Sequence, residues 1–302
     1  MPAPTVIAVF GPTGVGKTAV AIALAERLRG DGEDPVAVSV DALQLYRGLE
    51  ILTGAPTAAE RARLEHRLVG ILPLTASASA GDYARRAHAE IDALLAAGRR
   101  PIAVGGTGLY LRAALAQLDL RPPVPAAVRE RRRRELAERG APALHAELAA
   151  LAPEAAVRIR PTDSQRVTRA LELLDAGHLP AAGTENLWTA RLRRPTVLAG
   201  LTMDRDALYA RIDSRVDAMV AAGAVEEVRV AAATASRGAR QALGFEALLR
   251  GDVEQMKAQT RRYAKRQLTW MRKLSGARVI DVTDREPADV AAELHALLRR
   301  PA

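Results

Sequence analysis

The chain has 302 residues, of which 49% are hydrophobic and 26% charged, and it carries a formal net charge of +9 and no cysteine. This composition is typical of a globular enzyme with a sizeable core, and it excludes disulfides, thiolate nucleophiles and cysteine zinc sites. Because no apolar run approaches the roughly 18 residues of a membrane span and the N-terminus MPAPTVIAVFGPTG lacks the basic segment of a secretory signal, we expect a cytoplasmic protein without membrane contact.

Six short apolar runs are predicted to form buried strands, and most of them are followed by a helical pattern. The predicted strands are residues 5–10, 35–40, 67–72, 100–104, 196–203 and 277–282. Strands that alternate with helices are typical of an α/β fold, because each parallel strand must be reached by a crossover. We therefore expect an open parallel sheet of P-loop type with helices on both faces.

The strand pattern disappears in the middle of the chain. Helices are predicted there over residues 126–139 and 164–176, and proline-containing segments enter and leave the stretch. We therefore expect an all-helical insertion at residues 119–194, and a core domain formed by residues 1–118 and 195–302.

A glycine-rich turn follows the first predicted strand and leads into an apolar helix. Its sequence GPTGVGKT matches the P-loop pattern G-x-x-x-x-G-K-[ST] in full. Glycines let several backbone N–H groups point into one concavity, and the helix N-terminus and the lysine add positive charge. The predicted phosphate-binding residues are Gly11, Pro12, Thr13, Gly14, Val15, Gly16, Lys17 and Thr18, and Thr18 is the predicted Mg²⁺ ligand. A tight strand-to-helix turn without a ligand is the alternative.

A carboxylate and a second glycine turn are expected close to the P-loop. Asp41 follows the predicted strand 35–40, at the carboxyl edge where doubly wound sheets bind ligands. The alternative for Asp41 is a cap on the next helix. The turn GGTGLY at residues 105–110 offers backbone amides and the Thr107 hydroxyl as further donors. Together these groups predict a pocket with a base on one side and hydrogen-bond donors on the other.

Positive charge is concentrated in two segments. Residues 121–194 hold 14 arginines and nine acids, and residues 255–275 hold seven lysines or arginines and no acid. Such concentrations favour binding to a polyanion, because each phosphate contact releases counterions. The alternative for the run RERRRRE at 129–135 is a solvated helix face. The basic helix 261–273, which carries Tyr263 and Trp270, is expected to supply phosphate contacts, and the alternative for Trp270 is a position in the core.

The order and spacing of six motifs resemble those of the tRNA dimethylallyltransferases, from one end of the chain to the other. The motifs are GPTGVGKT (11–18), SVDALQLYRG (39–48), GGTGLY (105–110), PEAAVRIRPTDSQRVTRALE (153–172), RQALGFEAL (240–248) and RYAKRQLTWMRK (262–273). The resemblance implies transfer of a dimethylallyl group from dimethylallyl diphosphate to N6 of adenosine 37, beside the anticodon, in tRNAs that read codons beginning with U. It also implies that the P-loop binds the prenyl diphosphate and not ATP, although the motif is commonly called ATP-binding.

The resemblance assigns roles to individual residues. Asp41 matches the base that removes a proton from N6, and Thr107 matches the threonine beside the reacting adenine. Lys17, with Thr18, the loop amides and Mg²⁺, would stabilise the departing diphosphate. Arg215 matches an arginine directed at the same diphosphate, and its alternative is a surface position on a solvated helix face.

The resemblance also implies contacts with the anticodon stem-loop of tRNA, whose adenine must be flipped out of the stack to react. On the predicted helix that begins at Ser164, polar and apolar side chains occupy different faces, which leaves the polar face free for RNA. The implied RNA contacts are Asp41, Ala42, Leu43 and Gln44; Gln165, Arg166, Val167, Thr168 and Arg169; and Gln241, Ala242, Leu243, Gly244, Phe245 and Glu246. We expect a monomer with tRNA and dimethylallyl diphosphate as its partners.

Three positions depart from the family pattern. Ala42 replaces a common serine, Thr162 a usual asparagine and Phe245 a tyrosine, so position 245 has no hydroxyl with which to form a hydrogen bond. Two other functions remain open at this point. A small-molecule or nucleotide kinase would use the P-loop for ATP, and a non-catalytic RNA-binding protein would bind tRNA without forming a product.

Overall fold

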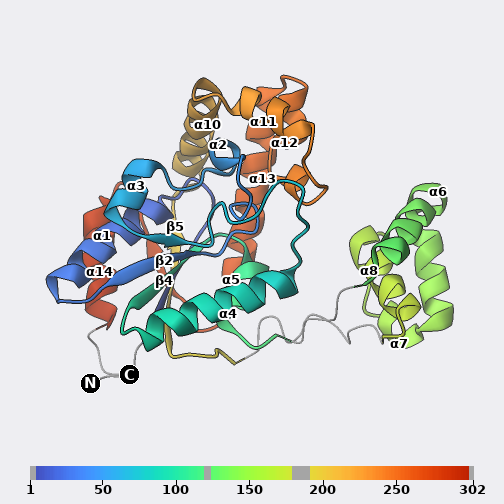
Figure 1. The fold of residues 1–302 in the computed structure, drawn as a ribbon, viewed down its shortest axis with the longest axis horizontal. Coiled ribbons are helices and arrows are strands. Elements are labelled where there is room, and N and C mark those ends of the chain that lie inside the picture. The colour runs from blue at the N-terminus through green and yellow to red at the C-terminus, as the bar shows by residue number, and fades with distance from the viewer. Residues whose placement is uncertain (1–4, 119–123, 179–190, 299–302) are drawn as a thin grey trace. The chain divides into compact units, whose positions relative to one another are not determined.

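The structure, a computed structural model, describes residues 5–118, 124–178 and 191–298 and contains two compact units (Figure 1). Unit 1 comprises Met1–Gln117 and Ala190–Ala302, and unit 2 comprises Leu118–Thr189. The chain re-enters unit 1 at Ala190, before the expected boundary at residue 195. The reason is that Leu192 pairs with Ala116 in an antiparallel bridge, and the Arg193 N–H donates to the Leu115 carbonyl at 2.8 Å.

Unit 1 is built on a six-stranded sheet with the strand order β3-β2-β4-β1-β5-β6, and every neighbouring pair is parallel. The α/β class expected from the sequence is therefore confirmed. The strands are β1 (Val6–Phe10), β2 (Pro35–Ser39), β3 (His66–Arg67), β4 (Arg100–Gly105), β5 (Thr196–Thr202) and β6 (Arg278–Asp281). The P-loop strand β1 lies at the centre, between β4 and β5.

The predicted strand over 67–72 is wrong in extent, because β3 has only two residues. Leu68 has a left-handed backbone with φ 61°, and Gly70 follows with φ 64°, so the chain turns away from the sheet. Leu72 returns only as an isolated bridge to Tyr46. The apolar run 67–72 therefore packs as a loop beside the sheet edge.

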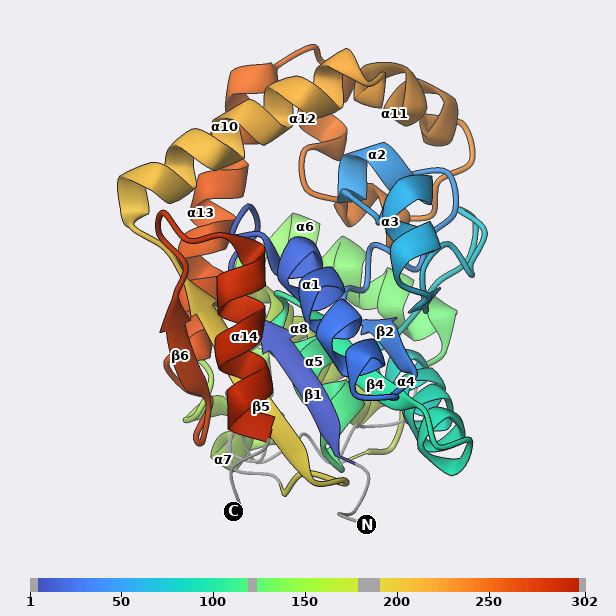
Figure 2. The same cartoon turned by 90° about the vertical axis from the view of Figure 1, so that its left-hand side faces the viewer.

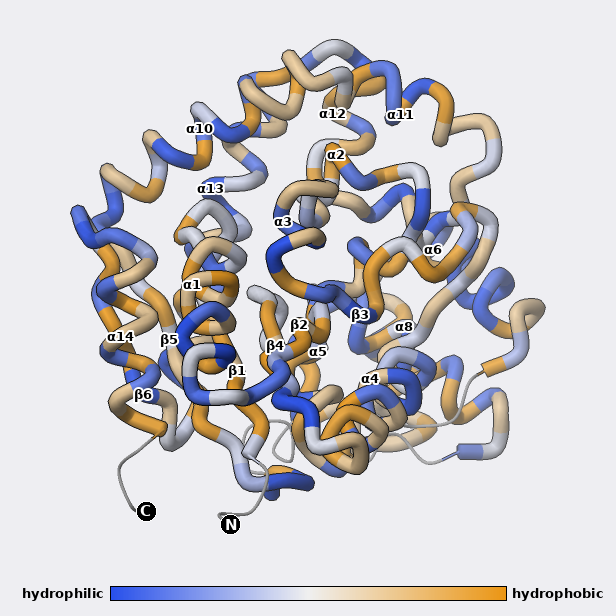
Figure 3. Tube along the Cα trace, turned by 60° about the vertical axis from the view of Figure 1, so that its left-hand side comes forward, coloured by the Kyte–Doolittle hydropathy of each residue, from blue (hydrophilic) through white to orange (hydrophobic). Residues whose placement is uncertain are grey.

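Helices cover both faces of the sheet. In Figure 2, α1 (Lys17–Gly30) and α14 (Pro287–Leu298) lie across the face turned toward the viewer. The opposite face carries α4 (Ala80–Ala96) and α5 (Gly108–Leu115). The hydrophobic colour in Figure 3 follows the central strands, because a parallel sheet covered on both sides is apolar along its whole length.

A group of helices stands beyond the carboxyl ends of the strands in Figures 1 and 2. It consists of α2 (Glu50–Thr53), α3 (Ala58–Arg63), α10 (Arg205–Ala221), α11 (Ala224–Ala232), α12 (Phe245–Leu249) and α13 (Val253–Met271), with a 3₁₀ turn at Ala239–Gln241. A second apolar cluster that includes Leu52, Val216 and Met256 packs α2, α10 and α13 together. This cluster fixes the helices around the end of the sheet where ligands of such folds bind.

Unit 2 contains α6 (Ala126–Leu151), α7 (Pro153–Ala156) and α8 (Ser164–Asp175), and no strand among its described residues. The predicted helix end at 139 coincides with a kink at Gly140, where φ is 74° and ψ is 164°, and a second helical stretch of α6 follows the kink. Apolar side chains of α6 and α8 form a separate small core. Across the ranges that the structure describes, no helix has the length and hydropathy that crossing a bilayer requires.

Candidate active site at the carboxyl edge of the sheet

The P-loop connects β1 to α1 and has the backbone shape that its glycines allow. Gly14 and Gly16 adopt φ values of 84° and 95°, which side chains other than glycine rarely tolerate. A Cβ atom on Gly11 would lie 2.9 Å from the Leu201 carbonyl oxygen of β5. The Lys17 ammonium donates to the Pro12 carbonyl at 2.8 Å, so the lysine lies across its own loop.

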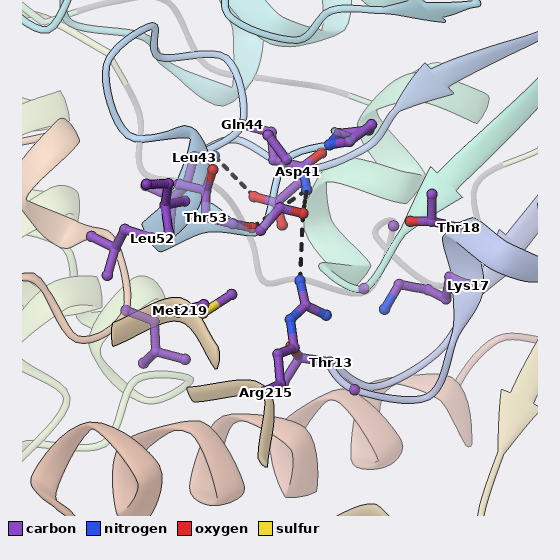
Figure 4. A pocket seen from close by; sticks show the side chains of 18 of the residues that line it. Thr13, Lys17, Thr18, Asp41, Leu43, Gln44, Leu52, Thr53, Arg215 and Met219 are labelled. Atoms are coloured by element: carbon purple, nitrogen blue, oxygen red, sulfur yellow. Dashed lines mark hydrogen bonds between the residues drawn. The ribbon is translucent and has the colours of Figure 1, made fainter. Parts of the chain in front are cut away.

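A cavity of about 970 Å³ opens beside the P-loop, and only unit 1 lines it. Figure 4 shows the side chains of Lys17, Asp41 and Arg215 directed toward one common space. The cavity walls come from the P-loop, the ends of β2 and β4, and helices α2, α10 and α13. The sequence placed Lys17 and Asp41 at one sheet edge, and the structure brings both side chains to the same cavity.

Asp41 lies two residues beyond Ser39, the last residue of β2, and it is half-buried. Its Oδ1 accepts the backbone N–H of Leu43 at 2.9 Å, which closes a local turn. The alternative of a helix cap is wrong, because the next helix, α2, begins only at Glu50. Burial raises the pKa of Asp41, while the Leu43 N–H and the charge of Lys17 oppose the rise. A carboxylate with a raised pKa is the better proton acceptor.

Two cations face Asp41 in the cavity. Burial and, to a smaller extent, the nearby Arg215 lower the pKa of Lys17 to about 7, and the charge of Asp41 opposes both effects. Arg215 comes from α10, and its Nη2 donates to the Gly54 carbonyl at 3.4 Å. Arg215 is exposed and its side chain lines the cavity, as does that of Arg211, so its role at the diphosphate stays a prediction beside the alternative of a solvated helix face.

The second glycine turn reaches the site through Gly105 and Gly106, which line the cavity. Thr107 stands just before α5, and its side chain makes no capping bond with that helix. Instead, its hydroxyl forms a 2.7 Å hydrogen bond with the Tyr263 hydroxyl, and Tyr263 itself lines the cavity. Burial raises the pKa of Tyr263 to about 12, so the phenol stays protonated at neutral pH.

Gln267 is a site residue that reasoning from the sequence missed. Its side chain is buried, and its Oε1 accepts the backbone N–H of Thr13 in the P-loop at 2.8 Å. The spacing of Tyr263 and Gln267, one helical turn apart, would have placed both on one face of the basic helix. Trp270 is half-buried and packs edge-on against Tyr263 with ring centroids 6.2 Å apart, so it supports a residue of the site.

The segments predicted to contact RNA in unit 1 divide into accessible and buried side chains. Leu43, Gln44, Gln241 and Leu243 line the cavity. In contrast, the Phe245 side chain is fully buried, and Ala242 and Gly244 beside it are also buried. The Phe245 side chain packs in the core below the guanidinium of Arg240. The prediction that this side chain contacts RNA is therefore wrong.

The predicted RNA-binding residues of α8 belong to unit 2. Gln165 and Arg166 are exposed, and Arg169 is partly exposed. Val167 is fully buried in the core between α6 and α8, so its side chain offers no RNA contact. Arg166 pairs with Asp163 at 3.5 Å, and Arg169 with Glu172 at 3.2 Å. The polar and apolar faces expected from the sequence are thus present, and the RNA contact itself stays a prediction.

Comparison with known proteins points to one family. The family model described as IPP transferase matches residues 44–274. The chain is 44% identical over 281 residues to a tRNA dimethylallyltransferase of Thermobifida fusca (strain YX), a match that covers 89% of this chain and 87% of the relative. A tRNA dimethylallyltransferase of Streptomyces avermitilis is 43% identical over 301 residues, with 94% of each chain covered.

Solved structures give the same result. A tRNA isopentenylpyrophosphate transferase from Bacillus halodurans superposes with a TM-score of 0.69 at 33% identity, covering 98% of this chain and 95% of its own. A eukaryotic dimethylallyltransferase, solved in the course of acting on tRNA, superposes with a TM-score of 0.78 at 25% identity, covering 98% of this chain and 80% of its own. The similarity therefore includes both the fold and the length of the chain.

Proposed function

Because this chain belongs to the IPP transferase family, we propose that it transfers a dimethylallyl group from dimethylallyl diphosphate to N6 of adenosine 37 in tRNAs that read codons beginning with U. The observation that carries the proposal is the cavity in which the P-loop lysine and Asp41 face each other. The kinase alternative is not favoured, because the similar proteins are named dimethylallyltransferases and not kinases.

The P-loop side of the cavity supplies the groups that a diphosphate needs. Backbone N–H groups at the start of α1 and the cations Lys17 and Arg215 would meet its negative charge. Among the described residues, no three acidic or histidine side chains are grouped to hold a metal ion. A Mg²⁺ ion at the Thr18 hydroxyl would therefore take its other ligands from diphosphate oxygens and water, and it would neutralise charge there.

Asp41 is suited to act as the base of this reaction. The exocyclic N6 of adenine is a poor nucleophile, because its lone pair is delocalised into the ring. In the proposed step the N6–C1 bond forms, the C1–O bond to diphosphate breaks with its electron pair leaving on oxygen, and the N6 proton passes to the Asp41 carboxylate. The raised pKa of Asp41 supports this role.

The apolar part of the cavity would hold the dimethylallyl group. Leu52 of α2 and Met219 of α10 line the cavity on the side away from Lys17 and Thr18 (Figure 4). Val216 belongs to the same lining. Such a wall stabilises a five-carbon chain by burying it, and it excludes water from the reacting carbon.

Labelled dimethylallyl diphosphate tests the proposal. With a tRNA that carries adenosines at positions 36 to 38, the wild-type protein should give labelled RNA, and nucleoside mass spectrometry should identify N6-dimethylallyladenosine. Asp41→Asn should lower kcat by about 10²- to 10⁴-fold with tRNA binding retained, whereas the exposed Asp206→Asn should behave as wild type. Absence of product from the wild-type protein, or ATP hydrolysis that depends on Lys17, would overturn the proposal.

A further inference from the structure

We propose that Leu52 of α2 and Met219 of α10 set the length of the prenyl chain that the cavity accepts, so that donors longer than dimethylallyl diphosphate are excluded. The inference rests on the proposed function, because it concerns the part of the donor that meets the apolar wall. Three observations carry it: the place where the cationic and apolar walls meet, the packed core behind the apolar wall, and the position of Asp41 in the same cavity.

The cationic and apolar walls of the cavity meet at Gly54. The Gly54 carbonyl accepts from the Arg215 Nη2 at 3.4 Å. A Cβ atom placed on Gly54 would overlap the same nitrogen and would lie 3.0 Å from the Met219 Cε, so the guanidinium and the thioether end adjoin at this glycine. Leu52 lines the same cavity two residues earlier, and Figure 4 shows it with Met219 on the side away from Lys17. A donor whose diphosphate lies at Lys17 and Arg215 would therefore direct its carbon chain along Met219 and Leu52.

The apolar wall is the edge of a packed core. Leu52 is only 4% exposed, and it belongs to the apolar cluster that also contains Leu49, Val228 and Phe245, three buried residues outside the cavity lining. Met219 packs against the same cluster. The space behind the two wall residues is therefore filled by buried side chains, and a carbon chain can enter it only by displacing them.

A longer chain that avoids this wall has to turn back into the open part of the cavity, which Asp41 also lines. The nucleobase needs that space, because the Asp41 carboxylate must reach the N6 proton. Burial of additional methylene groups favours binding wherever a chain fits, so the hydrophobic effect by itself would select longer donors. Discrimination against them therefore has to come from a clash with the wall, which a five-carbon chain avoids.

Two donors of different length test the inference. The protein is incubated with tRNA and with either dimethylallyl diphosphate or the ten-carbon geranyl diphosphate, and kcat/KM is measured for each donor. The ratio of the ten-carbon to the five-carbon value should rise at least about tenfold in Leu52→Ala and in Met219→Ala, since a methylene group in an apolar pocket changes specificity by about 10- to 200-fold. Both values come from one preparation, so an inactive fraction cancels from the ratio.

Matched control variants separate the wall from the core behind it. Leu49→Ala and Val220→Ala remove apolar groups that pack in the same cluster but lie outside the cavity lining. They should lower stability and leave the ratio of the two donors unchanged, because the voids they create do not open into the cavity. Met219 is only half-buried, so Met219→Ala keeps the test available if Leu52→Ala does not fold.

Three results would overturn the inference. The first is an unchanged ratio in a folded Leu52→Ala or Met219→Ala protein, and the second is an equal rise of the ratio in the control variants. The third is a wild-type protein that uses geranyl diphosphate as well as dimethylallyl diphosphate. A wild-type protein that labels tRNA with neither donor would instead refute the proposed function, so the two failures are distinguishable.

Discussion

Asp41 and Lys17 change each other's proton affinity across the cavity. Burial raises the pKa of Asp41 and lowers that of Lys17, and the charge of each partly reverses the shift of the other. A base of raised pKa accepts a proton more readily, and a lysine with a pKa of about 7 is only partly charged before its anionic substrate arrives. Both shifts favour the uncharged forms of the two groups, so the free site carries less charge than an exposed pair would.

This electrostatic state predicts a bell-shaped pH profile for kcat/KM. Asp41 must be deprotonated, so activity should fall as the pH drops through a value above its ordinary 3.8. Lys17 must be protonated to bind diphosphate, so kcat/KM should fall as the pH rises through about 7. The bound diphosphate raises the pKa of Lys17, so the alkaline limb of kcat should lie at higher pH than that of kcat/KM.

A substitution that keeps the charge isolates the alkaline limb. Lys17→Arg retains a cation that does not titrate below pH 12 or so, so the fall in kcat/KM near neutral pH should disappear, even if the absolute rate is lower. The measurement is kcat/KM for dimethylallyl diphosphate over the pH range in which the protein stays folded. An unchanged alkaline limb in this variant would assign it to a group other than Lys17.

At the residue scale, the sequence predicts the groups that belong to a local motif and misses those that depend on packing. The P-loop and Asp41 stand at strand ends, where chain order alone places them at one sheet edge. Gln267 reaches the P-loop from a residue 254 positions away, and this contact depends on how α13 packs. Phe245 shows the opposite error, since membership in a motif does not reveal that a side chain is buried.

Helix α2 shows how an element far away in sequence shapes the cavity wall. The Glu227 carboxylate of α11 accepts the backbone N–H groups of Ile51 and Leu52, each at 2.8 Å. These are two of the donors that a helix start leaves without an intrahelical partner. Four residues are too few for a stable isolated helix, so α2 and the cavity residues it carries depend on Glu227.

Glu227→Ala should therefore destabilise unit 1 by about 1 to 2 kcal/mol, the usual cost of a lost helix cap. It should also raise the KM for dimethylallyl diphosphate. Leu52 lies in α2, and Gly54, whose carbonyl accepts from Arg215, comes directly after it, so both shift when α2 is lost. Urea unfolding and steady-state kinetics provide the two measurements. Glu226→Ala, which removes an exposed acid at the neighbouring position, should change neither.

The arginine run of α6 is only partly the solvated face that composition suggested. Arg132 is buried, with its side chain 7% exposed, and it donates to Asp175 of α8 at 2.7 Å and to Glu147 at 2.6 Å. Glu135 is a third acidic partner, at 2.7 Å. This part of the positive charge is therefore neutralised inside unit 2 and is not available to a polyanion.

Arg132→Ala should loosen α6 and α8, because it removes the buried cation that three carboxylates share. Arg131 and Arg139 still pair with Asp175 and Glu147, so the cost should stay below the about 3 to 5 kcal/mol of a fully broken buried pair. Hydrogen exchange on the full chain should show lost protection in both helices and unchanged protection in the sheet of unit 1. Arg134→Ala, on the exposed side of the same helix, is the control and should change neither pattern. Equal loss of protection in both variants would mean that the ion network does not hold the helices.

At the element scale, strands and helices with a regular pattern were predictable, and irregular backbone was not. The error at 67–72 arises from the left-handed Leu68, which no apolar periodicity reveals. The predicted helix end at 139 matches the kink at Gly140, where two helical stretches meet within α6. In both places the backbone of a single residue, and not the hydrophobic pattern of its neighbours, determines where the regular element ends.

Over the whole molecule, the net charge of +9 has several separate uses. Lys17 and Arg215 serve the cavity, and Arg132 is paired inside unit 2. Arg261 and Lys257 of α13 pair with Asp213 and Asp217 of α10. The charge that remains for attraction of tRNA is therefore smaller than composition suggests, and its position matters more than its amount.

This distinction predicts how tRNA binding responds to salt. If the polar face of α8 contacts RNA phosphates, Arg166→Ala should weaken binding and reduce the slope of log K against log salt by about 0.7 to 0.9, the value for one phosphate contact. Arg134→Ala removes the same charge from another exposed position of unit 2 and should change the slope much less. Fluorescence anisotropy with an anticodon stem-loop, between about 50 and 200 mM salt, measures both variants. Equal losses would mean that net charge alone attracts the RNA, whereas a loss confined to Arg166→Ala locates the contact on α8.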